Sequence, residues 1–273
     1  MRIGIRAAIW CLVVLGAISM LIPFLWMVST SLKTDADAFA WPPQLIPIPP
    51  KWSNYPDALR IAPFGRFFFN SLFISVAVTL SSLFLNSLAA YGFAKFRFRG
   101  RNALFLGLLA TMMIPSQVTM IPAFLLLKQL GWLDSYAGLI VPGIAGAFGV
   151  FFLRQYMITL PDELFDAARI DGASEMAVYW RIVLPLAKPA LATLAIFTFM
   201  GSWNDFLGPL IVVKSEEMKT LPLAISALSA GHYVMSWPLL MAGACFVILP
   251  VLIIYILAQR FFVEGIAMGG VKG

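Results

Sequence analysis

The sequence predicts an all-α polytopic membrane protein with six transmembrane helices, and its composition and its long apolar segments carry this prediction. Of its 273 residues, 61% are hydrophobic and 12% are charged, whereas a soluble domain has about 45–50% apolar and about 25% charged residues. A helix needs about 20 mainly apolar residues to cross the hydrocarbon core of a bilayer. Six segments meet this requirement, at residues 7–32, 67–94, 103–127, 136–153, 189–213 and 239–262. The composition excludes a disordered chain, a collagen and a disulfide scaffold.

The first apolar segment follows Arg2 and Arg6 and begins like a signal peptide. Its apolar stretch is longer than the 7–15 residues usual in signal peptides, and no clear small-residue cleavage site follows it. We therefore expect it to remain as the first span. Cys11 and Cys245 lie inside long apolar runs, where a thiol commonly acts as a small apolar side chain, so no disulfide is expected.

The distribution of basic residues predicts the topology. Residues 95–101 contain four basic residues and no acid, whereas residues 128–135 contain one Lys and one Asp. Because Lys and Arg are enriched in cytoplasmic connections, six spans with both termini in the cytoplasm are expected. The cytoplasmic side then holds 12 of the 19 basic residues: Arg2, Arg6, Lys95, Arg97, Arg99, Arg101, Arg154, Arg169, Arg181, Lys188, Arg260 and Lys272. We expect contact with anionic membrane lipid and no nucleic-acid partner.

Two segments on the expected outer side are more than simple turns. Residues 33–66 contain Trp41, Trp52 and several prolines, a composition that opposes helix formation and favours an extended loop at the membrane interface. This loop is either a spacer with interfacial tryptophans or a functional element. Residues 221–237 are too short and too rich in Ser and Gly for a confident span, so an interfacial or partly re-entrant segment is expected. His232, in that segment, is expected to be solvated or interfacial.

The expected cytoplasmic segment 154–188 carries most of the functional information. From Pro161 it begins with proline and acids, which suit the first turn of a helix, and Gly172 suits the left-handed position that ends one. Ser174 is a candidate N-cap for a second helical stretch that ends at Pro185. We expect a helix–Gly–helix element that projects from the membrane.

One face of the first helix in this element is small and slightly apolar. Leu164, Ala167, Ala168 and Asp171 recur at helical spacing, and the two alanines would let another protein approach closely. A helix lying on the lipid surface is the alternative, but such helices usually carry Lys and Arg on their polar face. Anionic lipid would repel the acids of this element, which are Asp162, Glu163, Asp166, Asp171 and Glu175. The pattern therefore favours contact with a protein.

The same element resembles a known family motif. Asp166-Ala-Ala-x3-Gly172-x9-Ile182-x-Leu184-Pro185 is similar to E-A-A-x3-G-x9-I-x-L-P, the motif of the inner-membrane permease subunits of binding-protein-dependent ABC importers. Residues 133–139, the run Trp203-Asn204-Asp205 and the tail 258–273 are similar to the carbohydrate-type, MalG-like branch of that family. The resemblance covers about residue 67 to the end. Asp166 stands where the family usually has the longer Glu.

The resemblance implies a subunit that moves a sugar or oligosaccharide across the cytoplasmic membrane of a bacterium or archaeon, with glycerol phosphate or another polyol compound as the alternative solute. It divides the chain into a first span with its outer loop at 1–66 and a permease core at 67–273. It places a cytoplasmic coupling helix at about 159–185, between the fourth and fifth spans, and a tail at 263–273, both in contact with an ATPase. The expected contact residues are Asp166, Ala167, Ala168, Asp171, Gly172, Ala173, Ile182, Leu184 and Pro185, with Gly269, Gly270, Val271, Lys272 and Gly273 in the tail.

The resemblance also implies three kinds of partner: a second, MalF-like permease, a cytoplasmic ABC ATPase dimer and an extracytoplasmic solute-binding protein. The sequence contains no phosphate-binding loop of the form G-x-x-x-x-G-K-[ST], so we expect a non-catalytic subunit without cofactor or metal, and ATP bound by the partner. An ion-coupled transporter would need acids or polar clusters at mid-span. A membrane enzyme would need a nucleophile, base or metal cluster. The sequence indicates neither.

The fifth span contains the candidate solute path. Asp205 is the only acidic residue inside a predicted span, and it lies near the outer end. Trp203, Asn204 and Asp205 either line the path, with the indole ring stacking on a sugar, or form a hydrated helix end. In the tail, the glycines are expected to leave residues 262–273 too flexible to form a helix without a partner.

Overall fold

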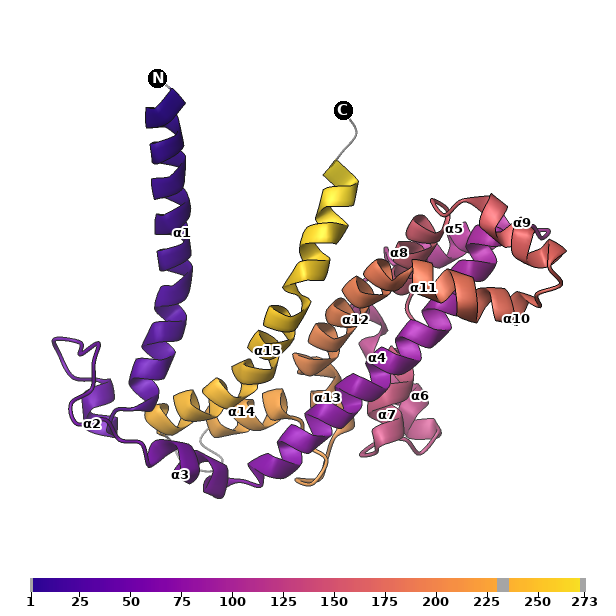
Figure 1. Cartoon of the computed structure of the whole chain (residues 1–273). Helices are drawn as coiled ribbons and strands as arrows, with labels where there is room; N and C mark the ends of the chain where they lie inside the picture. The colour runs from indigo at the N-terminus through magenta and orange to yellow at the C-terminus, as the bar shows by residue number, and fades with distance from the viewer. Residues whose placement is uncertain (1, 230–235, 271–273) are drawn as a thin grey trace. The chain divides into compact units, whose positions relative to one another are not determined.

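The computed structural model describes residues 2–229 and 236–270, and in this part the regular elements are all helices, with no strand (Figure 1). Contacts divide the chain into two units, residues 1–66 with 223–250 and residues 67–222 with 251–273. The helices, in chain order, are α1 (Arg2–Ser31), α2 (Asp35–Ala38), α3 (Asn54–Ile61), α4 (Phe64–Lys95), α5 (Arg101–Thr111), α6 (Ser116–Gln129), α7 (Tyr136–Ile140), η1 (Val141–Gly143), α8 (Ala147–Met157), α9 (Asp162–Ile170), α10 (Glu175–Val178), η2 (Tyr179–Val183), α11 (Leu184–Leu186), α12 (Lys188–Trp203), α13 (Leu207–Val212), α14 (Leu221–Ser229) and α15 (Trp237–Gly270).

Between four and six of the predicted spans have the length and composition to cross a membrane. Four are the helices Ile9–Ser31, Phe64–Lys95, Tyr136–Met157 and Trp237–Ile256. Two more arise if bent helix pairs are counted: α5 with α6, bent by 96°, and the helices of Glu175–Leu186 with α12, bent by 78°. The side of the membrane on which the termini lie stays a prediction.

Two sequence expectations about helix ends are wrong. The predicted fifth span, 189–213, is broken, because α12 ends at Trp203 and a separate short helix, α13, begins at Leu207. The tail was expected to lack helix, but α15 continues to Gly270. Residues 271–273, including Val271, Lys272 and Gly273, lie outside the described residues, as does His232.

The outer loop of the first unit contains more helix than its prolines suggest. α2 and α3 form on either side of the proline-rich stretch, which itself has no helix. The buried Asn54 amide donates hydrogen bonds to the carbonyls of Ser31, at 2.8 Å, and Lys33, at 2.7 Å. The expected extended loop is therefore correct only for about residues 40–52, and α3 is held against the end of α1.

Helix α4 carries a row of buried polar side chains in the second unit. The row consists of Asn70, Ser71, Ser75, Thr79, Ser82, Asn86 and Ser87. At one end the Asn70 amide donates to the carbonyls of Glu217, at 2.7 Å, and Lys219, at 2.9 Å, and the Ser71 hydroxyl accepts from the Leu221 N–H at 2.8 Å. Polar groups in lipid must be satisfied inside the protein, so these residues make α4 the helix around which the unit packs.

The glycine-rich span formed by α7, η1 and α8 packs against the middle of α4. The Gly146 N–H, at the start of α8, donates to Oδ1 of Asn86 at 3.1 Å, and the Asn86 amide donates to the Ser82 hydroxyl at 2.7 Å. Gly149 lies so close to Asn86 that a Cβ atom would overlap its amide. Glycine at position 149 therefore permits close approach of the two helices.

We predict that Gly149→Ala destabilises the protein by about 1–3 kcal/mol, because the added methyl group must displace Asn86 from its hydrogen bonds. Gly146→Ala is the matched control, since a Cβ atom at Gly146 meets nothing within 4 Å. Thermal unfolding of the detergent-purified proteins, followed by fluorescence, measures the difference. Equal midpoints for the two variants would contradict the packing described.

Candidate functional site

The helix–Gly–helix element forms as the sequence predicts. We call residues 162–186 the coupling segment. α9 ends at Ile170, and Gly172 has a φ of +82°, the left-handed conformation that glycine adopts without steric cost. The Ser174 hydroxyl accepts the Ala177 N–H at 3.3 Å and so caps α10. The two helices are therefore joined by a glycine turn, as expected.

The second half of the coupling segment contains a π-helical turn, η2, at Tyr179–Val183. In an α-helix, Val178 and Val183 would lie about 140° apart around the axis, since each residue turns the helix by about 100°. The wider π turn, with its i→i+5 hydrogen bonds, brings the two side chains nearer to one face. Both are fully buried, with Tyr179 between them. The sequence predicted the helical stretch but not this turn.

The inner face of the coupling segment packs into a hydrophobic core shared with neighbouring helices. Phe165 of α9 and Tyr179 of η2 are each 1% exposed. They belong to one buried cluster with residues of α4, α8 and α12, which are Ala90, Tyr91, Leu153, Met157, Ala190 and Leu194. Tight packing of this kind makes interiors transmit displacement rather than absorb it. The coupling segment therefore packs against three helices, α4, α8 and α12.

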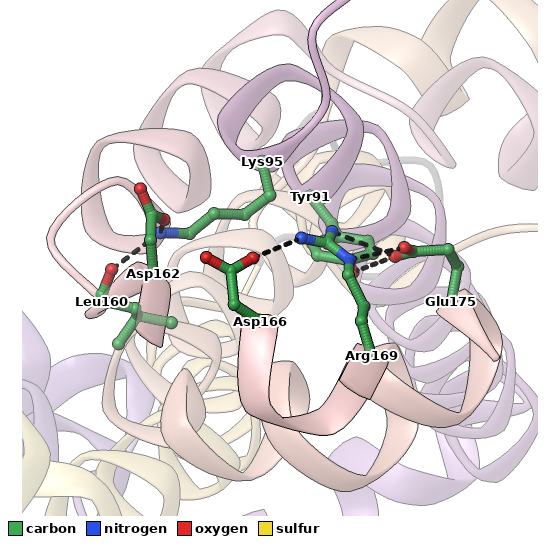
Figure 2. A network of polar contacts seen from close by, with 7 residues as sticks. All are labelled: Tyr91, Lys95, Leu160, Asp162, Asp166, Arg169 and Glu175. Carbon is green, nitrogen blue, oxygen red and sulfur yellow. Dashed lines mark hydrogen bonds and ion pairs between the residues drawn. The ribbon is translucent and has the colours of Figure 1, made fainter. Parts of the chain in front are cut away.

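Polar contacts attach both halves of the segment to the end of α4 (Figure 2). Lys95 Nζ lies 2.6 Å from Oδ1 of Asp162, donates to the Leu160 carbonyl at 2.7 Å, and lies 4.6 Å from the centre of the Phe165 ring. The Tyr91 hydroxyl donates to Oε2 of Glu175 at 2.7 Å. Sequence reasoning counted Lys95 only for topology and did not find Tyr91, because neither belongs to the motif.

Arg169 connects the two helices of the segment across the Gly172 turn. Its Nε lies 2.8 Å from Oε1 of Glu175, and one terminal nitrogen lies 3.2 Å from Oδ1 of Asp166 (Figure 2). The hydrogen bond to the Glu175 carboxylate raises the pKa of Arg169 above its usual range. Asp166, the shorter residue at the first motif position, therefore reaches a partner inside its own helix.

The predicted contact residues divide between the two faces of the segment. Asp166, Ala167, Asp171, Gly172 and Pro185 are exposed, whereas Ala168, Ala173, Ile182 and Leu184 pack against the core cluster. The exposed large apolar side chains on this element are Leu164 (45%), Ile170 (86%), Met176 (54%), Trp180 (53%) and Leu186 (37%). We call Leu164, Ala167, Ile170 and Met176 the outer face. Of the two alanines, only Ala167 is on the surface.

A cavity of about 540 Å³ lies within the second unit, lined by residues of α6, α7, α12 and α13. Its polar lining residues are Ser116, Gln117, Thr119, Thr198, Ser202 and Asp205. Ser116 and Gln117 begin α6, directly after the bend between α5 and α6. Because a non-helical backbone is tolerated at membrane depth only against protein or a water-filled cavity, the bend and the cavity are consistent with each other.

The three residues predicted to line the path occupy different environments. Only Asp205 lines the cavity, where its Oδ1 accepts the Gly208 N–H at 3.1 Å. Trp203 is fully buried, with its ring centre 5.7 Å from that of Phe199 and from that of Phe68. Its ring is therefore not free to stack on a sugar, which corrects that expectation. The exposed Asn204 turns its amide back to the Met200 carbonyl at 2.9 Å.

Asp134 explains the short motif at residues 133–139. Its Oδ1 accepts the backbone N–H groups of Lys214 and Ser215, each at 2.9 Å, and the Ser215 hydroxyl at 3.0 Å. The two backbone donors lower the pKa of Asp134, with that of Ser215 the larger influence. This carboxylate holds the connection after α6 to the connection after α13, which positions two of the helices that line the cavity.

Residues 82–266 match the family model described as "binding-protein-dependent transport system inner membrane component". The chain belongs to this family. The match includes the coupling segment and the cavity-lining residues of α6, α12 and α13. The protein is therefore a multi-pass permease subunit of a transporter.

Relatives of this permease transport sugars and a glycerol phosphate. The arabinooligosaccharide transport permease AraQ of Bacillus subtilis strain 168 is 44% identical over 208 residues, covering 76% of this chain and 74% of AraQ. The sn-glycerol-3-phosphate transport permease UgpE of Yersinia enterocolitica is 37% identical, with 97% of each chain covered. The chain is also similar to a chain of a bacterial ABC transporter that imports the acidic polysaccharide alginate, with a TM-score of 0.84, 28% identity and coverage of 95% and 96%.

A second solved structure has the same fold. It is the bacterial alginate ABC transporter in complex with an alginate-bound periplasmic protein, with a TM-score of 0.66, 16% identity and coverage of 93% and 94%. Together with the family match, these similarities establish the ABC permease fold for this chain.

The Lys95–Asp162 pair predicts an acid-sensitive attachment of α9. The hydrogen bond and charge of Lys95 lower the pKa of Asp162 from its ordinary value of 3.8, so the stabilisation is present above that value and is lost as the pH falls through the lowered pKa. We expect amide hydrogen exchange at residues 160–166 to accelerate between pH 5 and about pH 3, after correction for intrinsic rates. In Asp162→Asn, exchange should already be faster at pH 5 and change less. The same acid response in both proteins would contradict this role.

Proposed function

We propose that this permease subunit couples ATP hydrolysis by a separate ATPase to solute movement, with the coupling segment as the mechanical link. The supporting observation is that an exposed apolar outer face lies on an element whose other face is packed and salt-bridged to α4. A surface patch attached in this way moves together with the helices beneath it. An ATPase that displaces the outer face would therefore displace α4, α8 and α12.

The rest of the assembly follows from the family and its solved relatives. We infer a second permease chain, a cytoplasmic ATPase dimer that binds the ATP, and an extracytoplasmic solute-binding protein. The location is the cytoplasmic membrane of a bacterium or archaeon, with six spans and both termini in the cytoplasm. The basic connection at residues 95–101 supports this orientation, because the Lys95–Asp162 pair places it beside the coupling segment.

We propose that the cavity lined by Asp205 forms part of the solute path in this chain. A broken helix, hydroxyl and amide side chains, and a carboxylate at the edge of apolar segments are costly against lipid and favourable beside water. The names of the similar proteins offer three kinds of solute: arabinooligosaccharides, a glycerol phosphate and the acidic polysaccharide alginate. We propose a sugar or oligosaccharide as the solute and keep the glycerol phosphate as the alternative.

We predict that Ala167→Arg lowers solute uptake at least tenfold while the protein remains in the membrane, because a long charged side chain would hold the ATPase away from the outer face. Ala167→Ser, which stays small, should transport normally. Ala168→Arg should instead reduce the amount of folded protein, since residue 168 packs against the core. Uptake of labelled solute, together with co-purification of the ATPase, measures these effects. Normal uptake by Ala167→Arg with the ATPase bound would refute the contact.

The tail, residues 263–273, is proposed to enter the ATPase dimer interface. The helical backbone up to Gly270 gives it a defined path, although glycine destabilises the middle of a helix by about 0.5–1 kcal/mol. Deletion of residues 267–273 should reduce solute-stimulated ATP hydrolysis severalfold, with assembly retained through the outer face. Full stimulation in the truncated complex would show that the tail has no such role.

A further inference from the structure

The cavity in the second unit combines hydrogen-bonding groups of both kinds with a single charge. Among the described residues that line it, Asp205 alone is charged, and the others are apolar or carry hydroxyl or amide groups. Ser116, Thr119, Thr198 and Ser202 can donate and accept hydrogen bonds, and Gln117 can do both through its amide. No Lys or Arg is among these lining residues.

The carboxylate of Asp205 is held in place at the cavity wall. Its Oδ1 accepts the Gly208 N–H at 3.1 Å, and Gly208 lies so close that a side chain there would collide with Oδ2. The single backbone donor leaves acceptor positions open on the carboxylate, which can take several hydrogen bonds. Its negative charge therefore acts on whatever occupies the cavity.

The N-terminal end of α6 carries a partial positive charge, which is weaker than the negative charge of Asp205. Pro115 gives α6 no side-chain cap, and Ser116 and Gln117 of the first turn line the cavity. The positive end of a helix corresponds to about half an elementary charge, whereas the carboxylate carries a full one. A solute with many hydroxyl groups can donate to Asp205 and accept from α6 at the same time. A phosphate group cannot donate to the carboxylate once ionised and is repelled by it.

We propose that this cavity selects neutral polyhydroxylated solutes against anionic, phosphorylated ones, with the Asp205 carboxylate as the residue that sets this preference. The inference rests on the proposed function, because it assumes that solute passes through the cavity. The permease would thus contribute to the discrimination between the two solute classes, independently of the solute-binding protein. The carboxylate attracts hydroxyl donors and repels anions, so one charge in this cavity biases it against anionic solutes.

The test measures the electrostatic field in the cavity with thiol reagents of similar size. Ser202→Cys is introduced into the full transporter complex after Cys11 and Cys245 are replaced by Ser. The rates of modification by a neutral reagent, 2-hydroxyethyl methanethiosulfonate, and an anionic one, 2-sulfonatoethyl methanethiosulfonate, are compared in membrane vesicles. Ser53→Cys, at an exposed position in the other unit, is the reference thiol. Its two rates give the difference in intrinsic reactivity between the reagents.

We divide the ratio of neutral to anionic modification rates at residue 202 by the same ratio at residue 53. We expect this normalised ratio to be at least about 10 in the parent protein and less than about 3 in Asp205→Asn. Asp205→Glu, which keeps the charge, should retain the preference and serves as the matched control. If the two reagents react at equal normalised rates in the parent protein, or if Asp205→Asn leaves the preference unchanged, the proposed selectivity is wrong. Either result would leave the proposed solute path untouched. A residue 202 thiol that reacts with neither reagent would overturn the inference together with the proposed path.

Discussion

Satisfaction of polar groups along α4 is the constraint on which the described second unit depends. In lipid, an unsatisfied polar group costs several kcal/mol, and several polar side chains on this helix are satisfied by partners on other segments. Asn70 and Ser71 bind the chain before α14, and Asn86 binds the start of α8. Lys95 binds α9. Through these contacts α4 positions α8, which precedes the coupling segment, and the chain at the start of α14, which follows it.

This arrangement gives the coupling segment a direct mechanical route into the membrane-spanning helices. The segment contacts α4 through charged and aromatic groups and contacts α8 and α12 through the buried cluster. The exposed ion pairs contribute little to overall stability, because exposed pairs are commonly worth about 0–1 kcal/mol. Their value lies in fixing the orientation of a short element that could not hold its conformation alone, since isolated helices of this length are marginal in water.

The sequence predicted well those features that local chemistry determines. The helix of residues 162–170, its Gly172 turn and the Ser174 cap follow from residue types with strong positional preferences. The family motif does not reveal the orientation of its residues, because Ala167 and Ala168 are adjacent in it although they lie on different faces. Tyr91 and Lys95 were missed because their partners are more than 60 residues away in the chain.

The errors at the fifth span and the tail have a common physical origin. Apolar composition predicts that a segment can enter the membrane but not that its helix is continuous. Asn204 and Asp205 turn back to bind nearby backbone groups, and the helix breaks there. In the tail, glycine content argued for flexibility, but the long apolar helix that precedes it continues to Gly270. The burial of Trp203 also depends on Phe68, which is distant in sequence.

The π turn at residues 179–183 has a consequence for how the chain tolerates changes in length. A π turn has the form of an α-helix that has accommodated one added residue, so it sets the angular phase of everything that follows. Conversion of this turn to regular α-helix with every residue kept would rotate α11 and the start of α12 by about 100° relative to α10. Loss of one residue from the turn would restore regular α-helix and leave α11 and α12 close to their present orientation, so the coupling segment should tolerate a one-residue deletion here better than within α9 or α10.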